Sequence, residues 1–257
     1  MTKFGILFMT LLLSAFMAVA QDDNKSATEQ QHKNAAASDH NAAEQAKDEG
    51  NKTQARLDQA GAIIHELLAA PDKGIPEDVF ANAKCVAVVP SMIKGGFIFG
   101  AENGRGVATC RTGNGWSAPA FFAATGGSWG AQIGVAGTDL VMLIMNDNGM
   151  NQLLSSKFKI GAGVSAAAGP VGRDASASTN WKMKSEVLTY SRSRGVFVGA
   201  TLNGVAIRAD QDAMTSYYGH DAGFRPVLTG QVHDPHPDDR FVAAVRNGHT
   251  ESTAEKR

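Results

Sequence analysis

The sequence has no large excess of charge of either sign, and it lacks the glycine motifs that bind nucleotide phosphates. Its formal net charge is −1 at pH 7. Residues 75–230 carry 13 Lys and Arg against 10 Asp and Glu, an excess of +3, which excludes a histone-like nucleic-acid binder. No P-loop is present, and no complete dinucleotide-binding pattern lies between a strand and a helix. We therefore expect neither a nucleic-acid partner nor a cofactor.

Cysteine is also scarce. Only Cys85 and Cys110 occur, and both lie in segments with strand character. In an exported chain two such cysteines can keep a disulfide. Burial as two small apolar side chains is the alternative, because pairing needs a geometry that the sequence does not give. No cysteine follows Ala20 directly, so a lipoprotein anchor has no support.

The first 50 residues lack the composition of a folded domain. Residues 1–20 run from Lys3 through an apolar stretch to Ala18-Val19-Ala20, the order of a secretory signal peptide cleaved after Ala20. An uncleaved anchor is the alternative, but the apolar stretch is near the minimum length for a membrane span. Residues 21–50 contain no Pro, Leu, Ile, Val or aromatic residue, so we expect a disordered tether.

Two helices are expected after the tether. Apolar residues recur three and four positions apart within residues 52–70, which predicts an amphipathic helix that ends before Pro71. The members of this stripe are Leu57, Ala60, Ile64, Leu67 and Leu68. Pro76, at a first-turn position, predicts a second short helix that ends near residue 83.

Glycine is concentrated in the middle of the chain, among strand-forming residues. Residues 95–204 contain 20 of the 28 glycines. Glycine in a strand marks bulges, bends and close approaches of the backbone, so this block predicts a folded β domain. Hairpin turns are expected at Asn103-Gly104 and Asn114-Gly115, which makes the pairing antiparallel. Strands are expected at 85–89, 96–101, 106–111, 116–124, 132–135 and 140–145.

The second half of this block mixes helices and strands. We expect a short helix capped by Asp147 or Asn148, and a helix over 210–217 that ends at Gly219. Further strands are expected at 158–168, 185–191, 196–201 and 205–209, and a last helix at 237–246. The predicted fold class is therefore α+β: a glycine-rich curved antiparallel β-sheet or partly closed barrel with flanking helices.

Several short motifs follow one another between about residues 55 and 220. They are Lys94-Gly95-Gly96-Phe97, Arg105-Gly106, Trp116-Ser117-Ala118-Pro119, Gln132-Ile133-Gly134, Thr138-Asp139-Leu140, Ala168-Gly169-Pro170 with Gly172-Arg173, and Tyr190-Ser191 with Arg194-Gly195-Val196-Phe197. In this order and spacing they resemble the SYLF lipid-binding domain family, which includes Ysc84-like actin-binding members. The resemblance implies a non-enzymatic module that binds anionic phospholipids, phosphoinositides in eukaryotic members, partly through an amphipathic helix before the β region. Some fungal members also bind actin.

With this resemblance the chain divides into four expected parts. Residues 1–20 are a signal peptide, residues 21–50 a disordered tether, and residues 51–220 a SYLF-like lipid-binding domain. Residues 221–257 form a C-terminal extension with a short helix.

Basic residues occur in pairs two positions apart, and these are the candidate lipid-binding residues. The pairs are Lys157 and Lys159, Lys182 and Lys184, and Arg192 and Arg194. In an extended strand this spacing puts both cations of a pair on one face. We expect the six to share one surface and attract lipid phosphate, with Arg173 forking onto a phosphate from a turn. Ordinary solvent-facing positions of a half-exposed sheet are the alternative.

The helix expected within residues 52–70 is a second candidate for membrane contact, because an apolar helix face can lie in the headgroup layer. Its polar face has no basic excess, so packing of its apolar face into the core is the favoured interpretation. The charged residues of this polar face are Lys52, Arg56, Asp58 and Glu66.

Two other motifs point to enzymatic or metal sites. The first, residues 126–130, fits the GxSxG nucleophile elbow of a lipid esterase, with Ser128 as the nucleophile. Its partners would be Asp139 and one of His220, His233 and His236. The glycines and β-branched residues of 131–137 oppose the helix that this mechanism requires. The second motif, His233–Asp238, resembles a metal-ligand cluster, but its two prolines restrict convergence and a solvated loop is expected. We therefore predict neither an enzyme nor a metal site.

Together these features predict an exported protein, periplasmic or secreted, that associates peripherally with membranes. Its expected partner is an anionic phospholipid surface, and the sequence identifies no protein partner. A structural or protein-interaction role in the cell envelope is the alternative, and a GxSxG lipid esterase is less favoured.

Overall fold

A computed structural model describes residues 44–70, 74–155, 157–161, 164–171, 185–193, 196–199 and 204–254. The chain forms two units, Met1–Asp48 and Glu49–Arg257. In the first unit only residues 44–48 are described, and they are helical. The predicted signal peptide and most of the predicted tether therefore lie outside the described residues, and the following description concerns the second unit.

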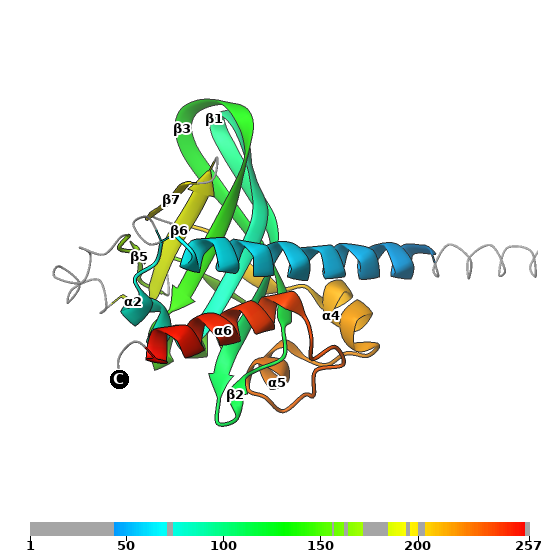
Figure 1. Ribbon diagram of the computed structural model, residues 1–257. Coiled ribbons are helices and arrows are strands. Elements are labelled where there is room, and N and C mark those ends of the chain that lie inside the picture. Colours follow the sequence, from blue (N-terminus) through cyan, green and yellow to red (C-terminus); the bar gives the residue numbers. More distant parts are fainter. Residues whose placement is uncertain are drawn as a thin grey trace, which may run out of the picture. The chain divides into compact units, whose positions relative to one another are not determined.

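The second unit is an α+β domain built on an eight-stranded sheet that curls strongly into a half-barrel with flanking helices (Figure 1). Two long antiparallel strands, β1 (Cys85–Thr112) and β3 (Ala120–Ile144), form most of the sheet. Figure 1 shows them bending over together at one end. The predicted fold class is confirmed.

The six short strands expected between residues 85 and 145 are wrong in number, because β1 and β3 are continuous. Asn103-Gly104, expected to be a hairpin turn, lies inside β1, where these residues pair with Thr125 and Ala124. The observed turn, at residues 113–114, joins β1 to the two-residue strand β2 (Gly115–Trp116).

Register shifts allow these long strands to bend without ending. One lies between Val89 and Met92 of β1, and a second lies between Gly96 and Ile98. An extra residue on one strand increases the local twist and bends that strand. The strand breaks expected from glycine are therefore bulges in continuous strands.

The two halves of β1 meet near the ends of the strand. A disulfide joins Cys85 to Cys110. Gly106 permits this approach, because a Cβ atom there would lie 2.7 Å from the Val88 carbonyl oxygen and would collide with the Phe122 ring. Of the two alternatives left open for the cysteines, the structure has the disulfide.

The other five strands form two groups, one on each half of β3. They are β4 (Lys157–Lys159), β5 (Ala166–Ala168), β6 (Val187–Ser193), β7 (Val196–Gly199) and β8 (Ala206–Ala209). β6 pairs with β3 at Asp139–Ile144 and carries β5 and β7 on its other edge. β8 pairs with β3 at Phe122–Thr125, and β4 pairs with β8. The single strand expected over 158–168 is thus divided between two parts of the sheet.

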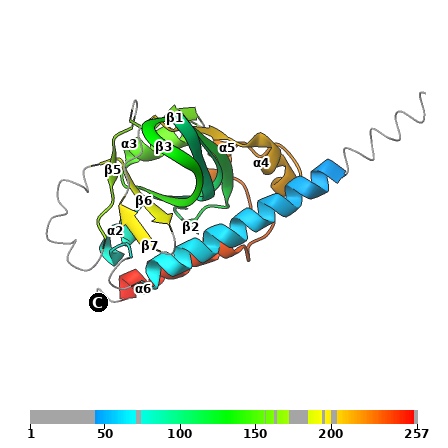
Figure 2. The same cartoon turned by 90° about the horizontal axis from the view of Figure 1, so that it is seen from above.

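Helices flank the curled sheet (Figure 2). The first begins at residue 44 and ends at residue 68. The others are α2 (Glu77–Ala81), α3 (Asp147–Leu154), α4 (Gln211–Tyr218), α5 (Phe224–Leu228) and α6 (Arg240–Ala254). As predicted, Gly219 ends α4, with a positive φ of 74°. Within the described part of the chain, no helix is both long and apolar enough to cross a membrane.

The apolar face of the first helix lies in the core. Leu57, Ile63, Ile64 and Leu67 are each at most 2% exposed. The opposite face is in solvent and carries polar and alanine side chains. Core packing, the favoured interpretation of this stripe, is confirmed, so this face is not available to a membrane in the folded domain.

The carboxyl group of Asp239, at the start of α6, is buried. We therefore expect the free energy of unfolding of the domain to depend on pH. Asp239 Oδ1 accepts a hydrogen bond from the Val242 amide at 2.9 Å, whereas its Oδ2 is buried without a partner among the described residues. Burial, and to a smaller extent the nearby carboxylate of Asp234, raise the pKa of Asp239 to about 6. Because the folded pKa lies above the unfolded pKa, this group lowers stability as the pH rises from about 4 to 6.

The variant Asp239→Asn tests this dependence, because asparagine keeps the capping oxygen but does not ionise. The free energy of unfolding of Asp239→Asn minus that of wild type will increase by up to about 3 kcal/mol between pH 4 and pH 7.5. Urea unfolding at both pH values measures the difference. Asp238→Asn, at an exposed neighbouring position, is the matched control. An unchanged difference between wild type and Asp239→Asn at the two pH values would contradict the prediction.

Candidate functional site

Three of the seven predicted lipid-binding residues are described. Lys157 and Lys159 lie at the two ends of β4 and are exposed, while Phe158 between them packs against the core. This is the alternation that the spacing of the two lysines predicts. The third is Arg192. The remaining predicted residues, Arg173, Lys182, Lys184 and Arg194, lie outside the described residues.

Arg192 is held by two acidic side chains. Its Nε and Nη2 atoms each lie 2.7 Å from Asp139 Oδ2, and its Nη1 atom contacts Glu66 of the first helix. It lies on β6, which pairs with the C-terminal half of β3. In contrast, β8 pairs with the N-terminal half of β3, and β4 pairs with β8. Arg192 therefore ties the first helix to the sheet, and the structure does not bring it into register with Lys157 and Lys159.

A different set of cations aligns with Lys157 across the sheet. Lys157 pairs with Arg208 of β8, Arg208 pairs with Ala123 of β3, and Ala123 pairs with Arg105 of β1. Residues directly opposite each other in antiparallel strands have side chains on the same face. We call Lys157, Arg208 and Arg105 the cation row. Sequence reasoning missed its two arginines, since the pairing of four strands cannot be read from local patterns.

The cation row lies on the outer face of the sheet. Its three side chains are exposed, whereas the adjacent residues Ile207 and Ala124, which point to the other face, are at most 1% exposed. Lys159 extends the same exposed face two residues along β4. Like charges placed directly opposite destabilise a sheet, and such local conflicts with folding are expected where a protein binds something.

A groove of about 380 Å³ lies over the centre of the cation row. Arg105 and Arg208 line it on either side of the small residue Ala123, together with Thr125. The start of α4, including Asp212, completes the lining. The small side chain of Ala123 leaves room between the two guanidinium groups for a polar ligand.

A partly buried ion network fixes the first helix beside this groove. Arg56 of that helix has Nη1 3.4 Å from Asp210 Oδ2, and Arg105 has Nη1 2.6 Å from Glu49 Oε1 and 3.6 Å from Asp210 Oδ2. Arg56 also lies over the Phe121 ring, 5.5 Å from its centroid. Burial lowers the pKa of Arg56 despite the neighbouring carboxylates. Arg105 is therefore partly neutralised by protein groups.

The other three cations on this face, unlike Arg105, do not take part in the ion network. Within the described ranges, Arg208, Lys157 and Lys159 make no ion pair with an acidic side chain. Their charge is therefore available to an anion from solution, and Arg208 combines this availability with a position in the groove.

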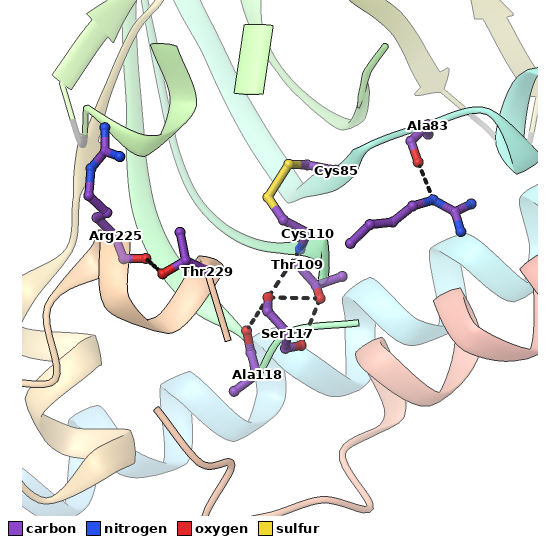
Figure 3. The surroundings of a disulfide bond; sticks show 9 residues. Ala83, Cys85, Thr109, Cys110, Ser117, Ala118, Arg225 and Thr229 are labelled. Carbon is purple, nitrogen blue, oxygen red and sulfur yellow. Dashed lines mark hydrogen bonds between the residues drawn. A yellow bond between two sulfur atoms is a disulfide. The ribbon is translucent and has the colours of Figure 1, made fainter. Parts of the chain in front are cut away.

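The family-like motif Trp116-Ser117-Ala118-Pro119 has a structural role beside the disulfide (Figure 3). The Cys110 amide donates to Ser117 Oγ at 3.1 Å, and Thr109 Oγ1 donates to the Ser117 carbonyl at 2.8 Å. The Pro119 carbonyl accepts a hydrogen bond from the Tyr218 hydroxyl at 2.8 Å. These contacts hold the connection from β2 to β3 in place, which is a structural role and not a ligand-binding one.

Two further motifs are also part of the scaffold. Gly169 lies against the buried ring of Tyr190, with which a Cβ atom at this position would collide. Asp139 accepts a hydrogen bond from the Ser91 amide at 2.9 Å, and Ser91 has a positive φ of 51° at the first register shift. These three motifs therefore specify the fold.

The geometry does not support the esterase alternative. Ser128 lies inside β3, where it pairs with Gly100 of β1, so the strand–turn–helix geometry of a nucleophile elbow is absent there. Asp139 is bound to Arg192, and His220 Nδ1 lies 2.9 Å from the Tyr218 carbonyl oxygen. These residues do not form the relay that the mechanism requires.

The loop with the metal-like motif makes contacts within the protein. Asp234 accepts hydrogen bonds from the Tyr217 hydroxyl and the His236 amide, both at 2.9 Å. The His236 ring packs edge-on against Tyr217, with centroids 5.1 Å apart. Among the described residues, no three His, Cys, Asp or Glu side chains converge as metal ligands.

Comparison with known proteins gives a consistent family match. A sequence profile of Ysc84, described as "Las17-binding protein actin regulator", matches residues 125–247. Protein YSC84 of Saccharomyces cerevisiae is 34% identical over 180 residues, which are 68% of this chain and 38% of that protein. LAS seventeen-binding protein 3 of the same species is 33% identical over 168 residues, 64% of this chain and 36% of that protein.

An animal relative shows the same extent of similarity. SH3 domain-containing YSC84-like protein 1 of Homo sapiens is 32% identical over 167 residues, which are 64% of this chain and 48% of that protein. The matched region thus spans between a third and a half of the length of these relatives.

Proposed function

The chain contains a Ysc84 domain and belongs to the Ysc84, or SYLF, family, and from this premise we propose that it is a non-enzymatic module that binds anionic phospholipid surfaces. The cation row is the observation that carries the proposal. It places Lys157, Arg208 and Arg105 in one line on an exposed sheet face, with Lys159 beside it.

Electrostatic attraction is sufficient for such an association. A cationic side chain near an anionic bilayer gains on the order of 1 kcal/mol, and that gain decreases as salt screens the surface field. Lys157, Lys159 and Arg208 together therefore contribute about 3 kcal/mol at low salt. The buried face of the first helix contributes nothing in the folded domain, so binding is peripheral and reversible.

We propose that the protein works outside the cytosol, in the periplasm or as a secreted protein. Residues 1–20 have the pattern of a signal peptide. The disulfide between Cys85 and Cys110 supports an oxidising compartment, because disulfides are rare where thiols are kept reduced.

Vesicle binding of the double variant Lys157→Gln/Arg208→Gln tests the proposed function. Wild type will bind phosphatidylcholine vesicles containing phosphatidylglycerol, and the variant will bind them roughly 30-fold more weakly because two near-surface charges are lost. Co-sedimentation with sucrose-loaded vesicles, at 0.05 M and 0.5 M salt, measures both affinities. The thermal midpoint will not fall, since the substitution removes a like-charge cross-strand pair.

The matched control is Lys84→Gln/Arg225→Gln, which removes the same charge outside the cation row, from an exposed arginine and from a half-buried lysine that pairs with Asp147. We expect its affinity for these vesicles to match that of wild type within about twofold. Equal binding of wild type to neutral and anionic vesicles, or equal losses in both double variants, would remove the cation row as the lipid site.

A protein partner is the second candidate. The family description names an actin regulator, and one relative is named for binding LAS seventeen. A protein that binds neither neutral nor anionic vesicles would favour this role over lipid binding.

A further inference from the structure

The groove over the cation row contains charges of both signs, which a simple anion site would not. Arg105 and Arg208 line it together with the carboxylates of Asp210 and Asp212. A ligand that carried only negative charge would gain from the arginines and be repelled by the carboxylates. The arrangement is therefore better matched to a ligand that carries both charges.

Two of these four charges are already satisfied by the protein. Asp210 lies 3.4 Å from Arg56 Nη1 and 3.6 Å from Arg105 Nη1, and its Oδ1 caps α4 by accepting from the Ala213 amide. Asp210 and Arg105 thus belong to the partly buried ion network. Their charges stabilise the attachment of the first helix and largely cancel within it.

Arg208 and Asp212 are the two charges left for a ligand. They lie four residues apart, on either side of Asp210, and both line the groove. Within the described part of the chain, neither forms an ion pair with the other or with another side chain. One unpaired cation and one unpaired anion therefore face the same small volume.

We propose that this groove binds a ligand with a phosphate ester and a primary ammonium on one short linker, as in the headgroup of phosphatidylethanolamine. Arg208 takes the phosphate, because a guanidinium forks onto two phosphate oxygens. Lys157, opposite Arg208 in the cation row, strengthens the field on that side. Asp212 accepts hydrogen bonds from the ammonium group. The inference rests on the proposed lipid-binding function: it names a net-neutral headgroup for the groove, while the cation row attracts the anionic surface around it.

The chemistry of the lining favours a primary ammonium over a quaternary one. Quaternary ammonium groups are recognised by the faces of aromatic rings, and no aromatic residue is among the described residues that line the groove. A carboxylate instead favours a group with N–H donors, because it accepts charge-assisted hydrogen bonds from them. Thr125 and Gln211 add neutral hydrogen-bonding groups to the lining.

Two soluble headgroups that differ only by three methyl groups test the inference. Titration calorimetry of the full chain will show binding of glycerophosphoethanolamine, and binding of glycerophosphocholine at least about tenfold weaker. Asp212→Asn will weaken binding of the first by about tenfold and of the second by less, because only the primary ammonium donates hydrogen bonds to the carboxylate. Arg208→Gln will weaken both. Asp147→Asn, which removes an exposed carboxylate elsewhere, will change neither.

The vesicle experiment separates this inference from the proposed function. Binding to anionic vesicles without preference between the two soluble headgroups would overturn the inference and leave the proposed function standing. An increase in affinity of Asp212→Asn for both headgroups would also overturn it, since the groove would then be an ordinary anion site. Binding of glycerophosphoethanolamine without any gain for vesicles that contain phosphatidylethanolamine would overturn the lipid as the source of the ligand.

Discussion

Replacing Arg56 by methionine will lower the free energy of unfolding by about 3 kcal/mol. Arg56 is 6% exposed and pairs with Asp210, which is 7% exposed. Removing one partner of a buried pair leaves the other charge uncompensated and costs about 3–5 kcal/mol. We expect the lower end of this range because Arg105 still lies 3.6 Å from Asp210. Urea unfolding at pH 7 measures the loss.

A surface pair gives the matched control for this variant. Arg240 pairs with Asp58 at 3.7 Å, but its side chain is 77% exposed, so Arg240→Met will cost less than about 1 kcal/mol. The double variant Arg56→Met/Asp210→Asn will lose less than the sum of the two single variants, because no buried charge is then left without its partner. Strict additivity would mean that the two side chains are not coupled.

The second large effect is expected from the disulfide. Replacing both Cys85 and Cys110 by alanine will lower the free energy of unfolding by about 3.5 kcal/mol, since a cross-link over this separation restricts the unfolded chain. The two cysteines are 25 residues apart. For a domain of this size the loss corresponds to a fall of roughly 10 °C in the thermal midpoint.

A reductant provides the control within the same experiment. Dithiothreitol will lower the midpoint of wild type to that of the double alanine variant, and it will not move the midpoint of the variant. Identical midpoints for oxidised wild type and the variant would show that the cross-link does not limit stability.

The sequence predicted the local elements well and their continuity poorly. The first helix and α4 follow from spacing and from end signals such as Asp210 and Gly219, which act within a few residues. Asn103-Gly104 carries the same local signal as a hairpin turn. Gly104 is instead needed because a side chain there would meet Val89 and Met92 of the other half of β1. That requirement arises only when the strand has folded back.

The candidate site shows the same division. The alternation of Lys157, Phe158 and Lys159 is local, and the structure has the expected exposed and packed positions. The alignment of Lys157 with Arg208 and Arg105 depends on pairing between strands far apart in the chain. Arg192 was expected at a lipid surface, but Asp139, 53 positions earlier, holds it. Contacts of this kind need the tertiary fold.

The first helix and α6, from opposite ends of the domain, pack closely against each other. A Cβ atom at Gly61 would lie 2.7 Å from the carbonyl carbon of Arg240, and Phe241 and Val245 of α6 are fully buried. During synthesis the first helix therefore lacks this packing partner until α6 has left the ribosome. The domain therefore completes its core only when its C-terminal helix has been synthesised.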